Sequence, residues 1–375
     1  MDAVQLTKSL IGFDTVSPPG NEEACARFIA DHLRDLHIEG ATVEVHRFAP
    51  GRANLVATFR GESPGLLLAG HIDVVPSGAE SGWSSPPFEA SARDGRIYGR
   101  GAADMKGGIA AMLVAIASAR RKRLKRSLTF VATAGEEVGF DGLRALQATG
   151  KLEGVAGRCG VVGEPTEMKV VRGHRGTVTA RVAFHGRSAH ASDPSMGVNS
   201  IEKAVAFIEK LGPLRKELSK AVDEDLGRTI LTPTVISGGT KSNVIPDSCE
   251  LTIDARTIPG VEGRTILEGL AAVGESLQKR DKSFSADIEV LYETSALSIP
   301  RKAEVVKLGE SITGSESTIA PFGTEAPDYC KLGIPTVVLG PGSVRQAHVL
   351  DEFVTTEQLE LAVAVYTKFV SDVCI

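Results

Sequence analysis

Two kinds of hydrophobic pattern alternate along residues 1–176. Short runs rich in apolar and β-branched residues predict strands, and the clearest are ATVEVHRF, NLVATFR, GLLLAGHIDVV, SLTFVATA and GVVGEP. Apolar residues spaced three or four positions apart predict helices, as in EEACARFIADHLRDL and DMKGGIAAMLVAIASAR. Several strand runs are almost continuously apolar, which is typical of strands buried on both faces of a sheet. The pattern therefore predicts an α/β fold with a mostly parallel sheet flanked by helices.

Residues 178–288 follow a different pattern. Their runs predict the order strand, helix, strand, strand, helix, strand, which is the split-βαβ arrangement of ferredoxin-like α+β modules. The α/β pattern then resumes and closes with an amphipathic helix, EQLELAVAVYTKFVSDV. At 375 residues the chain also exceeds the usual size of one domain. We therefore expect one α/β domain, residues 1–177 and 289–375, that carries an inserted domain, residues 178–288.

Composition and charge describe an ordinary globular protein. Hydrophobic residues make up 42% and charged residues 24% of the chain, and the net charge of −5 does not favour nucleic acid or an anionic membrane as a partner. The one basic run, RRKRLKR at residues 120–126, follows a predicted helix and is expected to be a solvated cap of its C-terminal end. The longest weakly polar run, GIAAMLVAIASA, is too short to span a bilayer. We therefore expect neither a nucleic-acid nor a membrane partner.

The cysteines and the N-terminal segment indicate the cellular compartment of the protein. Five cysteines without a CxxC pair predict neither a disulfide framework nor a thiolate zinc site. The N-terminal residues lack a basic segment followed by a long apolar one, so no signal peptide is expected. These features favour a reduced, cytoplasmic protein.

Acidic residues and histidines follow four of the predicted strands. In an open α/β sheet, ligands bind beyond the carboxyl ends of the strands, so these side chains are expected to converge on one site. A further acid, Asp104, begins the predicted helix DMKGG. The strand-end residues are His71 and Asp73 after LLLAG, Glu136 and Glu137 after LTFVATAG, Glu164 after GVVG, and His348 after TVVLGPGSVRQA.

Each of these residues has an ordinary structural explanation when it is considered alone. Those explanations are much harder to accept together, because every one of the residues stands at a predicted sheet end. The alternatives are a solvated turn for Glu136 and Glu137, a satisfied core histidine for His71, a helix cap for Asp104, a strand-end acid for Glu164, and a surface cluster with Asp351 and Glu352 for His348.

A pair of divalent metal ions explains the residues jointly. Adjacent acids such as Glu136 and Glu137 are costly near other acids unless positive charge compensates them, and a metal supplies that charge. Three carboxylates and two neutral imidazoles carry a charge of −3, against +4 from two divalent ions that would share Asp104 and a water. His71 and Asp73 face one way on a strand, so Asp73 can hold the ring nitrogen that does not bind metal. Nitrogen and oxygen donors without cysteine suit zinc and also accept cobalt or manganese.

Five segments, in chain order, resemble the motifs of a known enzyme family. They are GHIDVVP, GRGAADMKGG, TAGEEVG, GEPT and GPGSVRQAH, and the resemblance extends to the final helix. The family is that of the two-metal deacylases and peptidases typified by acetylornithine deacetylase and succinyl-diaminopimelate desuccinylase. The resemblance implies a zinc-exopeptidase-like catalytic domain with an inserted lid domain that also forms a homodimer.

The resemblance implies a role for each strand-end residue. Glu136 would be the general base that takes a proton from the attacking water and returns it to the leaving amine, and Asp73 would orient His71. The bridging Asp104 would be followed by a cis peptide bond to Met105. The metal ligands would be His71 and Glu164 for one ion, Glu137 and His348 for the other, and Asp104 for both.

The resemblance also covers the inserted domain. His190, in HGRSAHASDP, matches a family histidine that reaches the partner subunit's site and stabilises the oxyanion, which implies a homodimer. A loop histidine without function is the alternative, and His185 is a weaker candidate. Other residues match positions that bind substrate, where an arginine can hold a carboxylate through two hydrogen bonds or can instead form a surface salt bridge. They are Arg175, Asn243, Arg256 and Thr324.

The segment GTEAPDYCKLGIPTVVLGPGSVRQAH looks more like the acetylornithine deacetylase branch, in which Thr-Glu-Ala and Gly-Pro-Gly-Ser recur. Gly323 departs from that branch, which often has cysteine there. We therefore predict a metal-dependent hydrolase of an N-acyl amino acid, with N-acetylornithine and arginine biosynthesis as the narrow assignment. Succinyl-diaminopimelate, acetyl-citrulline, acetyl-lysine and small dipeptides are alternative substrates, and a ligand-binding protein without activity is the alternative to an enzyme. No G-x-S-x-G motif or Cys-His pair indicates a serine or cysteine hydrolase.

Overall fold

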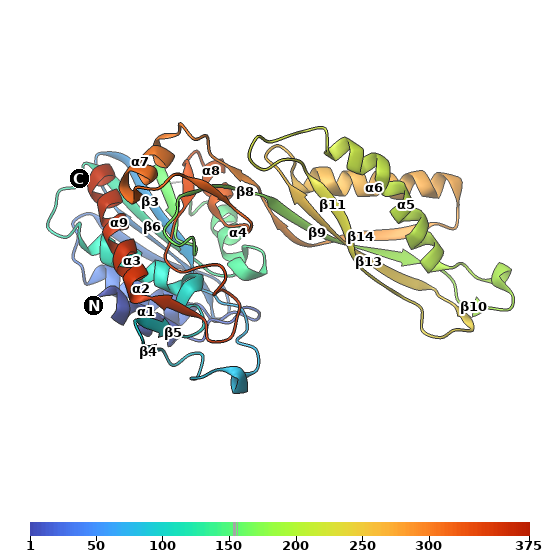
Figure 1. Cartoon of the computed structure of the whole chain (residues 1–375), viewed down its shortest axis with the longest axis horizontal. Helices are drawn as coiled ribbons and strands as arrows, with labels where there is room; N and C mark the ends of the chain where they lie inside the picture. Colours follow the sequence, from blue (N-terminus) through green and yellow to red (C-terminus); the bar gives the residue numbers. More distant parts are fainter. Residues whose placement is uncertain (153–154, 156) are drawn as a thin grey trace. The chain divides into compact units, whose positions relative to one another are not determined.

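The computed structural model describes residues 1–152, 155 and 157–375, and within them the chain forms two compact units (Figure 1). The inserted unit extends beyond the predicted residues 178–288 at both ends, because two of its strands, Gly176–His185 and Ser285–Thr294, continue past those limits. The first unit consists of Met1–Arg172, Ile299–Ala320 and Thr324–Ile375, and the inserted unit of Gly173–Ser298 and Pro321–Gly323.

The first unit is built on a sheet with the strand order β1-β2-β6-β3-β7-β17-β8, and β16 also pairs with β8. The middle of this sheet is parallel, because β3 pairs in parallel with β6 and β7, and β7 pairs in parallel with β17. The pairs β1–β2, β2–β6 and β17–β8 are antiparallel. The strand bounds are β1 Ala41–Ala49, β2 Arg52–Phe59, β3 Ser63–His71, β6 Arg126–Thr133, β7 Gly157–Val162, β8 Val171–His174, β16 Thr318–Ala320 and β17 Thr336–Val338.

The central strands are buried along most of their length. Strand β3 is buried from Gly65 to His71, and β6 is buried from Leu128 to Thr133. Helix α9 packs on both of these strands, and α2 packs on β1 and β2. This arrangement confirms the predicted α/β fold with a mainly parallel central sheet. The helices of the first unit are α1 Ala3–Ile11, α2 Glu23–Arg34, α3 Gly107–Ala117, α4 Asp141–Ala148, α7 Glu304–Thr313, α8 Ala326–Lys331 and α9 Thr356–Cys374.

Helix α3 follows directly from the loop Ala102–Lys106, which carries Asp104. Most of its residues are buried, and it packs against α1 and α9 as well as the sheet. A helix surrounded in this way is apolar on all sides, which explains the long apolar run in the sequence. The basic residues that follow it are exposed from Arg120 to Arg123.

A small three-stranded sheet lies in the order β18-β5-β4 and pairs Phe353 with Tyr98. It therefore brings the segment after His348 close to the segment before Asp104. No helix within the described residues is long and apolar enough to cross a membrane. The bounds of these strands and of two short helical turns are β4 Ser91–Arg93, β5 Arg96–Tyr98, β18 Phe353–Thr355, η1 Glu80–Gly82 and η3 Glu136–Val138.

The inserted unit has the chain order strand, helix, strand, strand, helix, strand, which is the split-βαβ arrangement. Its four main strands form an antiparallel sheet in the order β11-β13-β9-β14. Alternate residues of β9, from Val178 to Phe184, are buried in a core that also contains residues of α5 and α6. The helices therefore cover one face of this sheet. The bounds are β9 Gly176–His185, α5 Ser200–Leu218, β11 Ile230–Gly238, β13 Ser248–Thr257, α6 Gly263–Arg280 and β14 Ser285–Thr294.

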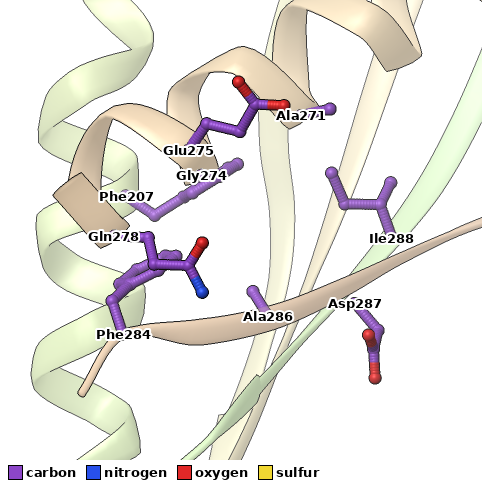
Figure 2. A pocket seen from close by; sticks show the side chains of 9 residues that line it. All are labelled: Phe207, Ala271, Gly274, Glu275, Gln278, Phe284, Ala286, Asp287 and Ile288. Atoms are coloured by element: carbon purple, nitrogen blue, oxygen red, sulfur yellow. The ribbon is translucent and has the colours of Figure 1, made fainter. Parts of the chain in front are cut away.

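A mainly apolar pocket of about 310 Å³ lies between α6 and β14 (Figure 2). The side chains of Ala286 and Ile288 face the helix, whereas Asp287 points to the other side of β14 (Figure 2). There Asp287 pairs with His185 at 2.8 Å. Gly274 lies on the helical wall of the pocket. The pocket opens to the surface, because Ala271, Glu275, Gln278 and Asp287 on its wall are exposed. The other lining residues are Phe207, Ala271, Glu275, Gln278 and Phe284.

Candidate metal centre

Four neighbouring parallel strands end at the same edge of the sheet, and each leads to predicted site residues. Strand β3 ends at His71, and its neighbour β6 leads through Thr133 to the turn Glu136–Val138. On the other side of β3, β7 leads to Glu164, and β17 leads to His348. The parallel pairing puts these carboxyl ends together, as expected for a site in an open α/β sheet.

Asp104 lies between the two histidines. Its Oδ1 is 3.0 Å from Nε2 of His71, and its Oδ2 is 3.3 Å from Nε2 of His348. The peptide bond between Asp104 and Met105 is cis, as the family resemblance implied. The carboxylate therefore offers one oxygen to each imidazole.

Two further carboxylates extend this arrangement into two groups. Oε1 of Glu164 is 3.6 Å from Nε2 of His71, and Oε1 of Glu137 is 3.0 Å from Nε2 of His348. Donor atoms of His71, Asp104 and Glu137 all lie within 4.8 Å of one another. One group contains His71 and Glu164, the other contains Glu137 and His348, and both share Asp104.

The electrostatics of the cluster favour added positive charge. Burial raises the pKa of Glu164 to about 7 and also raises the pKa of Glu137, with Asp104 adding to the effect on both. Hydrogen bonds to Asp104 and Glu137 raise the pKa of His348 to about 10. Burial disfavours a charged His71, but Glu164, Asp104 and Asp73 outweigh it and hold the pKa of His71 well above its usual value. The negative charge of the carboxylates thus favours protonation of the cluster, and bound cations would compensate the same charge.

The donor set fits divalent metal ions. Two donors on a tetrahedral ion with bonds of about 2.0 Å lie about 3.3 Å apart, and the pairs described above are separated by 3.0 to 3.6 Å. The donors are imidazole nitrogens and carboxylate oxygens, which suit zinc and other first-row ions. The described residues therefore have the chemistry and the spacing of a site for two ions that share Asp104.

Asp73 connects the loop after His71 with the turn that contains Glu136 and Glu137. The carboxylate of Asp73 accepts hydrogen bonds from the main-chain N–H groups of Glu136 (3.0 Å) and Glu137 (3.2 Å). The Nδ1 of His71 lies 2.9 Å from the main-chain oxygen of Asp73 and 3.6 Å from its carboxylate. The ring of His71 is therefore held mainly by the backbone of Asp73, while the side chain of Asp73 fixes the Glu136–Glu137 turn.

Glu136 is buried beside the cluster, with 8% of its surface exposed. Burial raises the pKa of Glu136 well above its usual value, and the charges of Glu164 and Glu137 add to the effect, while His71 opposes it. A carboxyl group with a raised pKa can hold a proton and release it near neutral pH, as a general acid and base must.

The candidates in the inserted unit lie at two opposite ends of its sheet. His190 is exposed on β10 (Ala189–His190), which pairs with β12 (Val244–Ile245), and the main-chain oxygen of Asn243 accepts a 3.0 Å bond from Ala191. Arg256 lies at the other end, where its Nε donates to Asp254 at 2.9 Å and its Nη1 donates to Thr177 at 3.0 Å. Since β9 extends from Thr177 to His185 between these ends, about 25 Å separates them.

The remaining two candidates have local partners. Nε and Nη2 of Arg175 both donate to the main-chain oxygen of Leu226, at 3.0 and 2.6 Å. Thr324 belongs to the first unit and is buried, and its hydroxyl accepts a bond from the N–H of Ala326 at 3.2 Å. The structure thus brings His190 and Asn243 together but keeps Arg256 away from them within one chain.

Two buried glutamates near the site received no functional role from the sequence, which placed Glu352 only in a possible surface cluster. Glu352 is fully buried, and its carboxylate accepts bonds from the loop that carries Asp104. Glu325 is also buried and accepts a 2.8 Å bond from the hydroxyl of Thr133 at the end of β6. The sequence signal for Glu352 was an acid directly before the short apolar strand in DEFV. The signal for Glu325 was an acid within the motif GTEAP.

Comparisons with known proteins identify the family of the chain. Residues 67–372 match the model of peptidase family M20/M25/M40. The chain is 34% identical over 360 residues to an acetylornithine deacetylase of Erwinia tasmaniensis, a match that covers 93% of this chain and 90% of that protein.

Two solved structures share the fold. An M20 family metallo-carboxypeptidase of Sulfolobus solfataricus superposes with a TM-score of 0.80 at 18% identity, covering 98% of both chains. A dinuclear metal-binding peptidase of the M20 family from Bacillus subtilis superposes with a TM-score of 0.66 at 16% identity, covering 98% of this chain and 96% of that one. The chain therefore belongs to peptidase family M20/M25/M40 and is a metal-dependent hydrolase that acts on amide bonds.

Proposed function

We propose that the protein hydrolyses the amide bond of an N-acyl amino acid, and that its substrate is N-acetylornithine, which it converts to ornithine and acetate. The observation that carries the proposal is the position of Asp104, with one carboxylate oxygen toward each of His71 and His348. The deacetylase that is 34% identical over most of the chain supports the choice of substrate.

In this proposal the five clustered side chains hold two divalent ions, with zinc as the first choice and cobalt or manganese as substitutes. When bound, the ions supply positive charge that lowers the pKa of a water molecule and polarises the scissile carbonyl group. His71 and Glu164 hold one ion, Glu137 and His348 hold the other, and Asp104 holds both.

Glu136 acts as the general base in the proposal. Its carboxylate takes a proton from the attacking water and later donates that proton to the nitrogen of the leaving amine. The raised pKa of Glu136, caused mainly by burial, supports this role, because it strengthens the carboxylate as a proton acceptor. Asp73 supports Glu136 by fixing the main-chain N–H of its turn.

His190 stabilises the oxyanion in the proposal. Nδ1 of His190 lies 2.7 Å from the hydroxyl of Ser192 and accepts the N–H of Ser192 at 3.2 Å. With Nδ1 as the acceptor, Nε2 carries the proton of the neutral ring and can donate it to an oxygen. Asn243 lies beside His190 and is proposed to bind the substrate with it. Arg256 is proposed to hold the substrate carboxylate, with Arg175 as the alternative. Both guanidinium groups already have partners: Arg256 bonds to Asp254 and Thr177, and Arg175 bonds to the main-chain oxygen of Leu226.

The separation within the inserted unit supports a homodimer. A small substrate cannot contact both His190 and Arg256 of the same chain across about 25 Å, so His190 and Asn243 are proposed to serve the site of a second copy. Strand β11 is an edge strand of its sheet, and Val235 and Ile236 on it are 59% and 52% exposed. An apolar sheet edge of this kind suits pairing with the same edge of another chain.

A substrate panel tests the proposal. Protein loaded with Zn²⁺ or Co²⁺ is assayed with N-acetylornithine, N-succinyl-diaminopimelate and a small dipeptide, and we expect the highest kcat/KM with N-acetylornithine. Chelation should abolish turnover, and Glu136→Gln should lower kcat by about 10²- to 10⁴-fold with metal still bound. Turnover that survives thorough chelation or the Glu136→Gln substitution would rule out the mechanism, and preference for another substrate would rule out the assignment.

A further inference from the structure

We propose that Glu352 is a positioning residue that holds the loop of the bridging Asp104 in place against the loops of both histidines. The inference rests on the proposed two-metal centre. Glu352 has no assigned role there, and none of its carboxylate contacts is with the side chain of a candidate ligand. It acts instead through main-chain hydrogen bonds to the loop that carries Asp104.

The carboxylate of Glu352 receives four hydrogen bonds. Its Oε1 accepts from the N–H groups of Ala103 (2.9 Å) and Asp104 (3.0 Å). Its Oε2 accepts from the N–H of Gly101 at 3.0 Å and from Nη1 of Arg100 at 2.6 Å. Because Glu352 is fully buried, no water competes for these bonds.

Arg100 connects this loop to a third one. Its guanidinium is also buried, and Nη2 donates to the main-chain oxygen of Pro76 at 3.2 Å. Pro76 follows His71 and Asp73 in the same loop. The ion pair between Arg100 and Glu352 therefore ties together the loops that carry His71, Asp104 and His348.

The segment from His348 to Glu352 has a backbone that needs such anchors. His348 has φ +61° and Asp351 has φ +51°, a left-handed conformation that residues other than glycine adopt rarely. Asp351 is held by the N–H and hydroxyl of Ser84, and Glu352 by the contacts described above. These two acids thus fix the end of the segment whose first residue, His348, faces Asp104.

A carboxylate is required because every partner of Glu352 is a donor. Glutamine offers only one acceptor oxygen, and its NH₂ group would point at other N–H donors in a buried place. Glu352→Gln should therefore release part of the loop Gly101–Asp104. The two oxygens of Asp104 would then no longer be held toward His71 and His348, and metal affinity should fall.

Two measurements test this on the full-length protein. Hydrogen–deuterium exchange of the metal-free protein reports on the peptide that contains residues 101–104, and titration with Co²⁺, followed by its visible absorption, reports affinity. We expect faster exchange in that peptide and about 10- to 100-fold weaker Co²⁺ binding for Glu352→Gln. Glu310→Gln is the matched control, because Glu310 also accepts bonds from a backbone N–H and a lysine, those of Ser317 and Lys307, but lies outside the candidate site.

Glu352→Asp provides a second variant if Glu352→Gln does not fold. It keeps the charge and the ion pair but is one methylene shorter, so it cannot reach all four donors, and the same two readouts should change in the same direction. If a folded variant at position 352 exchanges the peptide 101–104 at the wild-type rate and binds Co²⁺ with wild-type affinity, the inference is overturned while the proposed centre stays intact. A wild-type protein that binds no Co²⁺ would instead overturn the centre and, with it, the inference.

Discussion

The two units of the molecule present their polar side chains differently. In the first unit, His71, Glu136 and Glu164 are buried, and His348 is exposed but lies 3.0 Å from Glu137 and 3.3 Å from Asp104. In the inserted unit, His190 and Asn243 are exposed, and Arg256 lies at the far end of the sheet. The first unit thus brings its candidate residues together within one chain, whereas His190 and Asn243 are proposed to complete a site in a second copy.

The architecture of the sheets explains the difference. The parallel strands of the first unit are buried along most of their length, so the functional side chains gather where the strands end. The antiparallel sheet of the inserted unit has helices over one face, and its edge strand β11 exposes Val235 and Ile236.

The largest effect is expected from His190, and a mixed dimer tests where it acts. His190→Ala should lower kcat by about 10²- to 10³-fold if Nε2 stabilises the oxyanion. Co-expression of His190→Ala with Glu136→Gln under two purification tags yields mixed dimers. If His190 serves the other chain, one site of each mixed dimer is complete, and about half of the wild-type turnover should return.

The two single variants, purified alone, are the controls for this experiment. Mixed dimers that stay as inactive as the single variants would show that His190 and Glu136 act within one chain. The contrast between the two units would then lose its functional meaning.

A smaller effect is expected from Asp73→Asn. Asparagine keeps one acceptor oxygen, so the N–H of either Glu136 or Glu137 loses its partner, while the backbone contact to His71 can persist. We expect a folded protein whose Co²⁺ affinity or kcat is about 10- to 100-fold lower. Full activity and affinity in this variant would mean that the turn does not depend on the carboxylate of Asp73.

The stability of the first unit should depend on pH through Glu325. Burial, with help from Asp73 and Glu164, raises the pKa of Glu325 from its usual 4.5 to about 8, although the bond from Thr133 opposes the rise. Folded protein therefore holds this proton more tightly than unfolded protein. The resulting stability is complete below pH 4.5 and is lost as the pH rises through about 8, at about 1.4 kcal/mol per pH unit.

Glu325→Gln in metal-free protein removes that dependence, because the amide has no proton to lose. Urea unfolding should show that the variant gains stability relative to the wild type as the pH rises from 5 to 8. A constant difference between variant and wild type would contradict the assignment of Glu325.

His174 in the inserted unit should affect stability in the opposite direction. Burial lowers the pKa of His174 from 6.5 to about 4, so the stability it contributes is lost as the pH falls through that range.

The smallest effect is expected in the pocket of the inserted unit. A methyl group at Gly274 would lie 3.8 Å from Phe284, an ordinary contact, and alanine favours the helix (Figure 2). Gly274→Ala should therefore raise the free energy of unfolding by about 1 kcal/mol, measured by urea denaturation, and leave kcat unchanged. Gly269→Ala is the control, since its methyl group would lie only 2.4 Å from Leu214 and should give less stabilisation. Equal gains at both positions would show that the pocket is not what accommodates the new group.

Much of the fold and of the candidate cluster was predictable because its signals are local. Continuous apolar runs indicated the buried strands, and His71, Glu164 and the Glu136–Glu137 pair follow those runs directly. The boundaries of the inserted unit were less predictable, because β9 and β14 extend past the point where their sequence pattern changes.

The order of residues along the chain is enough to show which side chains follow the strands and that they include two imidazoles and several carboxylates. How these side chains are held depends on contacts between distant segments. Strand order put β6, β3, β7 and β17 side by side, and Glu352 reaches Asp104 from 248 positions away in the chain. Likewise, the carboxylate of Asp73 serves the Glu136–Glu137 turn more closely than the ring of His71. Such contacts depend on distance in space between distant segments, and a periodic pattern along the chain carries no record of that distance.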